Sequence, residues 1–323
     1  MRKLLIAVLI IVLLATVGLV LTPPALVNDA GVPALPADLD AYIAQREQAA
    51  AAEFLLIPGT EKRILWHAAR QKTPYSIVNL HGFSGSRQGI APLAERVADE
   101  LGANLFETRL TGHGRVQGAM AGVRAEDWLD DAAEALAVGA KIGKRVIIIG
   151  TSTGATLAVA MAQHAVFDSV DTLVMISPNF APKDPSARWI TRPGGPILLR
   201  GLVGETRSWQ ARNEEQERYW STSYPSAIIV EVMRLVDLAN GNLPLKIDQS
   251  VLTLLSPNDQ VVSPQATLAA LQQLEAPRAQ IIEFDDVGDP SNHVLAGDIL
   301  SPGNTDEVVA RIVEFVRQTR VAE

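Results

Sequence analysis

The stretch of sequence that decides the fold is RVIIIGTSTG, residues 145–154. Its first half is a short apolar run rich in β-branched residues, which indicates a buried strand. Its second half places Ser152 between Gly150 and Gly154, and an alanine-rich helical pattern follows. A serine on a tight turn from strand to helix projects above the edge of a sheet, beside the positive end of the helix dipole. Ser152 is therefore a candidate nucleophile, and a turn of small residues without chemistry is the alternative.

Outward from this stretch, apolar β-branched runs alternate with helical patterns along the chain. This alternation predicts a mostly parallel sheet covered by helices on both faces, which is an α/β fold. The expected strands are residues 75–80, 104–109, 146–149, 172–176, 251–255 and 280–284. The expected helices are residues 90–101, 125–142, 155–164, 264–274 and 305–317.

One interval interrupts the alternation, because about seventy residues separate Ser177 from the next expected strand. It contains an apolar helical stretch, residues 226–239, which ends at an Asn-Gly pair. We expect a helical cap inserted over residues 179–248. Its tryptophans either line a substrate pocket or pack the insert against the body. They are Trp189, Trp209 and Trp220.

Composition excludes several kinds of partner and site. A chain of 323 residues with 48% hydrophobic content can bury a substantial core. Its net charge of -8 gives no reason to expect a nucleic-acid partner. The absence of cysteine excludes disulfides, a thiol nucleophile and thiolate zinc sites. No pair of histidines has the spacing of a zinc motif, so we expect neither a metal nor a cofactor.

The first residues predict a membrane anchor. Arg2 and Lys3 precede an uncharged apolar run, residues 4–21, which as a helix spans roughly 27 Å, close to the ~30 Å hydrocarbon core. The positive flank lies before the run, so the N-terminus is expected in the cytoplasm and the body outside it, in the periplasm if the source is bacterial. A cleaved signal sequence followed by secretion is the alternative. The predicted parts are an anchor or signal over residues 1–22, a linker and helical segment over 23–53, and a catalytic body over 54–323.

A second functional signal follows the first expected strand, where the chain reads HGFSGS, residues 81–86. Glycines at this position allow backbone N–H groups to point into a cavity. Such donors stabilise the oxyanion that forms during acyl transfer. The predicted donors are the backbone amides of Phe83 and Thr153, and we expect His81 to brace the loop rather than act as a base.

Three motifs in this order resemble the α/β-hydrolase superfamily, of the serine esterase, monoacylglycerol lipase and serine aminopeptidase type. They are residues 81–85, 109–114 and 150–154, and the resemblance extends from Phe54 to the C-terminus. It implies the α/β-hydrolase fold and a catalytic order of serine, then acid, then histidine. Ala155 departs from the pattern, since many members have another glycine there.

The candidates for the catalytic acid and for the catalytic base lie later in the chain. Asp259 follows the fifth expected strand and fits the place of the acid, although an Asn-Asp pair there is also ordinary turn chemistry. The rivals Asp285, Asp286 and Asp289 lie too close to the histidine for the order that the resemblance implies. His293, in the loop before the last expected helix, matches the catalytic histidine of the family, and a histidine of a surface loop is the alternative.

Together these roles predict a serine hydrolase that cleaves a carboxylic ester, lipid-like or with a small acyl group, through an acyl-enzyme on Ser152. His293 would remove the proton of the serine, and Asp259 would orient the imidazole. A peptidase or acyltransferase with the same triad remains an alternative, as does a catalytically silent binding scaffold. The expected partners are a small-molecule ester and a membrane, and the oligomeric state stays open.

Overall fold

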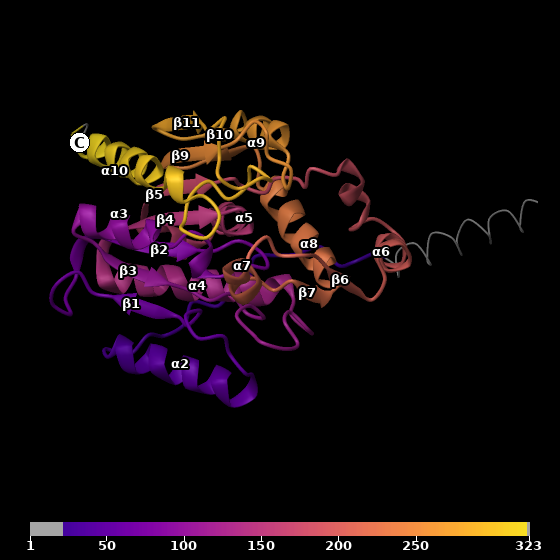
Figure 1. Cartoon of the computed structure of the whole chain (residues 1–323). Coiled ribbons are helices and arrows are strands. Elements are labelled where there is room, and N and C mark those ends of the chain that lie inside the picture. Colours follow the sequence, from indigo (N-terminus) through magenta and orange to yellow (C-terminus); the bar gives the residue numbers. More distant parts are fainter. Residues whose placement is uncertain (1–21, 322–323) are drawn as a thin grey trace, which may run out of the picture.

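A seven-stranded sheet forms the centre of the chain, which the computed structural model describes over residues 22–321 (Figure 1). The strand order is β1-β3-β2-β4-β5-β9-β11. Every neighbouring pair is parallel except β1 and β3. The strands are β1 (Arg63–Leu65), β2 (Thr73–Leu80), β3 (Asn104–Glu107), β4 (Gly143–Thr151), β5 (Val170–Ile176), β9 (Ser250–Leu255) and β11 (Ala279–Glu283).

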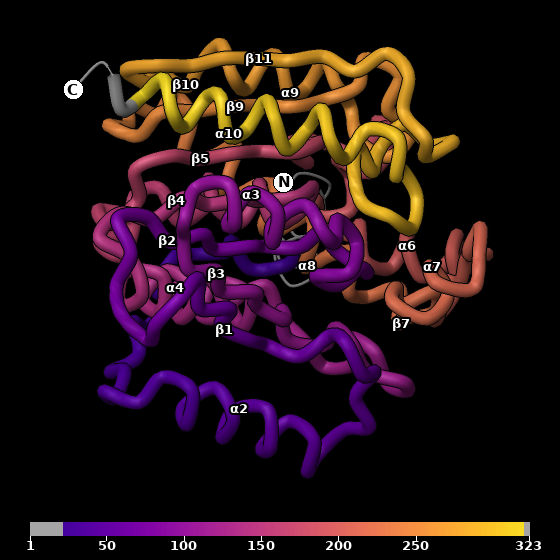
Figure 2. The backbone as a smooth tube through the Cα atoms, turned by 60° about the vertical axis from the view of Figure 1, so that its left-hand side comes forward, coloured from indigo at the N-terminus to yellow at the C-terminus, as the bar shows by residue number. Residues whose placement is uncertain are grey.

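Helices cover both faces of this sheet, as the views in Figures 1 and 2 agree. On one face lie α3 (Leu93–Leu101) and α10 (Thr305–Val321), and on the other α4 (Ala125–Ile142), α5 (Thr153–Ala160) and α8 (Ile228–Gly241). Successive strand residues belong to different cores: Ile77 and Ile147 face α3 and α10, whereas Val78 and Ile148 face α4. Side chains alternate along a strand, so central strands apolar on both faces need two helical layers. The predicted α/β class is confirmed.

The direction of chain winding reverses between β2 and β4. From β2 the chain moves to β3 on one side, and it then returns to form β4 on the other side. Leu80 pairs with Gly150, so the two strands end together. In an open parallel sheet, loops at such a switch point separate and leave room for a ligand. Residues 81–86 and Ser152 both occupy this place.

The observed elements differ from the expected ones mainly at their ends. The short β1 was not predicted, because it offers only three half-buried residues and no alternation. Strand β4 begins three residues earlier than expected, at Gly143, and α5 ends at Ala160. Helix α3 begins after Pro92, and α10 continues to Val321. Helix α4 has the expected bounds.

An insert between β5 and β9 projects beyond the sheet, with α6 at the right edge of the body in Figure 1. It includes α8 and a small antiparallel pair of strands, β6 (Thr206–Ser208) and β7 (Ser223–Pro225). Its other elements are η3 (Pro185–Trp189), α6 (Gly195–Val203), α7 (Glu214–Tyr219) and β8 (Leu245–Lys246). The remaining elements of the chain are η1 (Arg87–Gly89), η2 (Ala165–Ser169), α9 (Pro264–Leu271), β10 (Leu274–Glu275) and η4 (Pro302–Asn304).

The N-terminal residues that the structure describes lie against the body. The Asn28 side chain donates to the carbonyl of Ala160 at 3.0 Å, and the Gly31 amide donates to Asp130 at 3.1 Å. Helix α2 (Leu39–Glu53) follows and runs beside the sheet edge formed by β1 (Figure 2). The predicted anchor run, residues 4–21, lies outside the described residues. Within residues 22–321, no helix has the length and apolar character needed to cross a membrane.

Candidate active site

Ser152 occupies the turn between β4 and α5. Its backbone has φ 53° and ψ -116°, and its amide donates to the carbonyl of Ile176 at 2.8 Å. A Cβ atom at Gly154 would lie 2.0 Å from the carbonyl oxygen of Leu80, and one at Gly150 would lie 2.8 Å from the Cα of Ala155. No larger residue fits at these two positions, so the glycines allow the sharp turn that aims the serine away from the sheet.

His293 and Asp259 form a hydrogen-bonded pair in loops that follow β11 and β9. The Nδ1 of His293 lies 2.7 Å from Oδ2 of Asp259. The other carboxylate oxygen of Asp259 accepts the amides of Val261 and Val262 at 2.7 and 2.9 Å. With both oxygens engaged, the buried carboxylate is fixed and holds one ring nitrogen of the histidine as a donor.

Ser152 and His293 line the same cavity, which opens to solvent. Its wall also includes the loop after β2, Ile90, and Trp220 of the cap. Residues distant in sequence, from the turn after β4 and the loop after β11, therefore meet at the switch point of the sheet. A serine, an imidazole and a carboxylate in this order can activate the hydroxyl for attack on an acyl carbon.

The three rival aspartates have other places. Asp285 and Asp286 are exposed. Asp289 is buried, and its carboxylate accepts the amides of His293 and Val294, each at 3.1 Å, and the hydroxyl of Ser291. Burial raises the pKa of Asp289, but the hydrogen bonds from Ser291 and these amides outweigh it and lower the pKa below its usual value. Asp289 thus holds the backbone of the histidine loop, whereas Asp259 holds the ring.

Ser177 is a further residue at the site for which the sequence suggested no role. It follows β5 directly, has φ 47°, and donates its hydroxyl to the carbonyl of His293 at 2.7 Å. A polar residue at the C-terminal end of a strand was the only signal for it. Together, Ser177 and Asp289 fix both sides of the His293 backbone.

The loop after β2 lies directly against the serine. A Cβ atom at Gly82 would lie 3.2 Å from the Cβ of Ser152 and 3.3 Å from the carbonyl oxygen of Thr151, so a larger residue here would crowd the serine. Within residues 22–321, the amides of Phe83 and Thr153 donate to no other group of the protein. Both belong to residues adjacent to the cavity or to the serine, as expected for donors to an oxyanion.

Two buried histidines join this loop to residues 109–114. The Nδ1 of His81 donates to the carbonyl of Gly82 at 3.0 Å, and its Nε2 accepts the Leu110 amide at 3.0 Å. The Nε2 of His113 accepts the amide of Ser84 at 3.1 Å. Burial lowers the pKa of His81 to about 4, and burial together with His81 lowers the pKa of His113 well below its usual value. Both rings are therefore neutral braces with no nitrogen left to act as a base.

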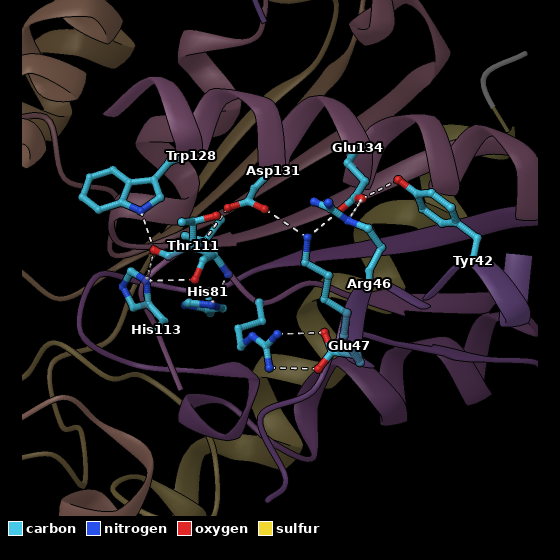
Figure 3. Close-up of polar contacts among 12 residues, drawn as sticks. Tyr42, Arg46, Glu47, His81, Thr111, His113, Trp128, Asp131 and Glu134 are labelled. Atoms are coloured by element: carbon cyan, nitrogen blue, oxygen red, sulfur yellow. Dashed lines mark hydrogen bonds and ion pairs between the residues drawn. The ribbon is translucent and has the colours of Figure 1, made fainter. Parts of the chain in front are cut away.

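Behind these histidines, α4 fixes Thr111 from two sides (Figure 3). The Thr111 amide donates to the buried carboxylate of Asp131, and its carbonyl accepts Nε1 of Trp128 at 3.0 Å. Asp131 also accepts Lys62 at 3.0 Å, and Lys62 contacts Glu134 one turn further along α4. Buried charges in direct contact hold each other in one geometry.

Helix α2 completes this network from the surface side. Tyr42 donates to Glu134 at 2.6 Å, and Arg46 pairs with the same carboxylate at 2.9 Å (Figure 3). Glu47 pairs with Arg109 at 2.9 Å. Burial and the neighbouring Glu134 raise the pKa of Tyr42 to about 12, so it remains a hydrogen-bond donor. The loop that braces the active site is thus tied to α2 through charged side chains.

Two of the three cap tryptophans take one each of the two expected roles. Trp220 lines the cavity and packs closely against Gly85 and Gly89. A Cβ atom at Gly85 would lie 3.2 Å from the indole, and one at Gly89 would lie 3.3 Å from it. The amide of Ser221 donates to the carbonyl of Ser84 at 2.7 Å and docks the cap there. Trp209 packs against the hydrophobic core, and Trp189 is 54% exposed. Over residues 22–321, no three His, Asp or Glu side chains are grouped to hold a metal ion.

Comparison with known proteins places the chain among related folds. A model described as the alpha/beta hydrolase family matches residues 77–305. A thermostable monoacylglycerol lipase of Bacillus sp. (strain H-257) is 25% identical over 242 residues, which are 75% of this chain and 90% of that protein. A solved structure described under the metagenome-derived lipolytic enzymes LipS and LipT is 20% identical with a TM-score of 0.65, covering 81% of this chain and 99% of its own. The monoacylglycerol lipase of Paleococcus ferrophilus is 17% identical with a TM-score of 0.57, covering 79% and 98%.

Proposed function

The chain belongs to the alpha/beta hydrolase family and is a hydrolase of lipase and esterase type, and we propose that it cleaves carboxylic esters through an acyl-enzyme on Ser152. The observation that carries the proposal is that Ser152 and His293 line one cavity while Asp259 binds the far side of the imidazole at 2.7 Å. In this mechanism His293 takes the serine proton during attack and returns it to the leaving alcohol. Water then cleaves the acyl-enzyme with the same histidine as base.

The oxyanion of each tetrahedral intermediate would lie between the amides of Phe83 and Thr153. The first comes from the loop braced by His81 and His113, and the second from the start of α5. Loss of one such donor typically costs ~10²–10³ in rate. These two amides are the proposed source of transition-state stabilisation.

The proposed substrate class is an ester with one acyl chain, such as a monoacylglycerol. The wall of the cavity formed by Ile90, Phe83 and Trp220 is apolar, which suits an acyl chain. The relative from Bacillus sp. is a monoacylglycerol lipase by its name. A peptidase or acyltransferase would use the same catalytic groups, so the choice rests on substrate.

We also propose that residues 4–21 anchor the protein in a membrane with the hydrolase body outside the cytoplasm. The run is uncharged and follows Arg2 and Lys3. A fusion reporter active only outside the cytoplasm, attached after residue 323, tests this arrangement. A full-length fusion that is produced but shows no reporter activity would contradict it.

The catalytic proposal is tested on the full chain in detergent micelles with a fluorophosphonate probe. We expect a single adduct on the peptide that contains Ser152, and none in the Ser152→Ala variant. Monoacylglycerols and p-nitrophenyl esters of graded chain length are then compared with aminoacyl amides. Turnover of esters with medium or long chains supports the proposal, whereas turnover of amides alone, or an unlabelled Ser152, overturns it.

A further inference from the structure

The cap carries an exposed apolar face. Its members are Trp189, Ile197, Leu198 and Leu202, which are 54, 59, 56 and 77% exposed. Three of them lie on α6, whose Leu199 points inward and is 8% exposed. We call these four residues the cap face. Large apolar side chains gathered in this way on a small insert indicate a surface that is covered by a partner.

The segment that carries the cap face is rich in exposed basic residues, although the chain as a whole is acidic. Residues 183–207 contain five basic side chains and two acidic ones, whereas the whole chain has a net charge of -8. One of the acids, Glu205, is already paired with Arg200. The other basic residues of the segment are Lys183, Arg188, Arg192 and Arg207. Exposed apolar side chains on a segment with these basic residues, which we call the basic rim, match the surface of an anionic lipid bilayer.

The start of the described chain lies beside the same insert. Arg234, on α8, donates to the carbonyl of Pro24 at 2.9 Å. Helices α6 and α8 both lie to the right of the sheet in Figure 1. The uncharged apolar run of residues 4–21 is thus joined to the body next to the cap. A membrane that holds this run would lie near the cap rather than at the opposite edge of the sheet.

We propose that the cap face docks on the surface of an anionic bilayer. Ile197, Leu198 and Leu202 would enter the boundary between head groups and acyl chains, Trp189 would lie at head-group depth, and the arginines would contact lipid phosphates. A second copy of the chain is a poorer occupant, because it would bring one basic rim against another. This docking does not require that Ser152 be catalytic.

The test uses the full chain, which contains no cysteine, so that a single introduced cysteine can be labelled uniquely. The variants Leu198→Cys and Leu202→Cys carry a fluorophore, and the protein is reconstituted into phosphatidylcholine vesicles with or without phosphatidylglycerol. Spin-labelled lipids serve as quenchers. The matched control is Ile281→Cys on β11, which is 45% exposed but belongs to the edge strand of the sheet.

Lipid quenching at positions 198 and 202, strengthened by phosphatidylglycerol and absent at 281, is the expected result. High salt should weaken it, because screening reduces the attraction of arginine to anionic lipid. Quenching that is equal at all three positions, or absent at 198 and 202, overturns the proposal. Transfer of energy between labels that rises with protein concentration and ignores lipid charge would assign the face to a second copy instead, and would also overturn it.

A charge reversal separates docking from mere proximity. Arg192→Glu in the Leu198→Cys background should remove most of the part of the quenching that depends on phosphatidylglycerol. Lys144→Glu makes the same change at an exposed residue at the start of β4 and should leave quenching intact. Hydrolysis of a water-soluble ester in detergent should be the same in both variants, so failure of docking and failure of the hydrolase proposal are distinguishable. Equal quenching in the two variants contradicts the role of the basic rim.

Discussion

Asp289 accepts the backbone N–H of His293 at 3.1 Å, and the imidazole of the same histidine is bound by Asp259. Both carboxylates are buried, at 1% exposure each, yet they act on different parts of one residue. Asp259, which binds the ring, affects which nitrogen of the imidazole carries the proton. Asp289, which binds the backbone, affects the position of the loop. Substitution of each should therefore give a different kinetic result.

Asp259→Asn should lower kcat by about 10³–10⁴-fold with little change in fold, since the amide favours the wrong tautomer of the imidazole. Asp289→Asn should lower stability and reduce kcat far less, because the ring partner remains. Initial rates on a water-soluble ester and thermal unfolding measure both effects, with the exposed Asp286→Asn as control. A larger loss of kcat in Asp289→Asn than in Asp259→Asn would reverse the two roles.

Ser177→Ala removes the hydroxyl that binds the carbonyl of His293 at 2.7 Å. Loss of such a hydrogen bond costs about 0.5–1.5 kcal/mol and frees the backbone of the catalytic histidine, so we expect kcat to fall by up to about tenfold with KM unchanged. Ser169→Ala is the matched control, because its hydroxyl binds the Val166 carbonyl at 3.0 Å away from the cavity. It should cost stability without a change in kcat. A fall in kcat of the same size in both variants would make the effect of Ser177 purely structural.

The neutral histidines behind the oxyanion loop should make the protein sensitive to acid. An unfolded histidine binds a proton below a pH of about 6.5, whereas folded His81 does so only near pH 4, so stability is lost as the pH falls between these values. Over this whole pH range, the protonation of His81 lowers the free energy of unfolding by about 3 kcal/mol. His81→Asn should lower stability at pH 7 but flatten its decline on the acid side, as denaturant midpoints from pH 7 to 4 would record. The exposed His67→Asn should keep the original slope, and an unchanged slope in His81→Asn would contradict the neutral brace.

Sequence patterns predicted the central elements because those elements are specified locally. The β-branched run before Ser152, and the glycines whose missing Cβ atoms leave room for the turn, are consecutive in the chain. Strands apolar on both faces and separated by amphipathic helices required two helical layers, and the structure has them. The order of the motifs was sufficient to identify the family.

What the patterns did not predict depends on contacts between distant segments. Nothing near Ser177 in the sequence indicates that its hydroxyl meets the carbonyl of a residue 116 positions later. Likewise, Lys62, Asp131 and Glu134 look like ordinary surface charges until β1 and α4 come together. The choice of Asp259 over Asp289 rested on family order, whereas in the structure only Asp259 contacts the ring.

Gly85 and Gly89 lie against the indole of Trp220 and should therefore affect substrate access to the cavity. Gly89→Ala places a methyl group 3.3 Å from the indole without requiring positive φ, so Trp220 must shift into or out of the cavity. We expect KM for long-chain esters to change about tenfold with a smaller change in kcat. Gly303→Ala has open space around its Cβ and serves as control. Identical chain-length profiles of Gly89→Ala and the unmodified protein would remove Trp220 from substrate selection.

Among the residues of the buried charge network, Lys62 should contribute most to the stability of the fold. Its side chain is 6% exposed, and burial lowers its pKa, but Asp131 and Glu134 together outweigh burial and raise the pKa above its usual value. Lys62→Met keeps the volume and leaves two buried carboxylates without their shared cation, which should cost about 3–5 kcal/mol in the free energy of unfolding. Because Asp131 also holds the Thr111 amide, kcat should fall as well. Unfolding by denaturant and initial rates measure the two effects.

The matched control is Lys246→Met, which breaks a pair with Glu275 whose side chains are 73 and 70% exposed. Solvent screens such a pair, so its loss should leave the denaturant midpoint nearly unchanged. The double variant Lys62→Met/Asp131→Asn removes the charge of Asp131, which Lys62→Met leaves without a cation, and keeps an oxygen that accepts the Thr111 amide. It should regain part of both stability and kcat, because the cost of Lys62→Met is the unpaired charge rather than lost packing. A double variant less stable than Lys62→Met would mean that Asp131 acts mainly through a contact that the carboxamide cannot replace.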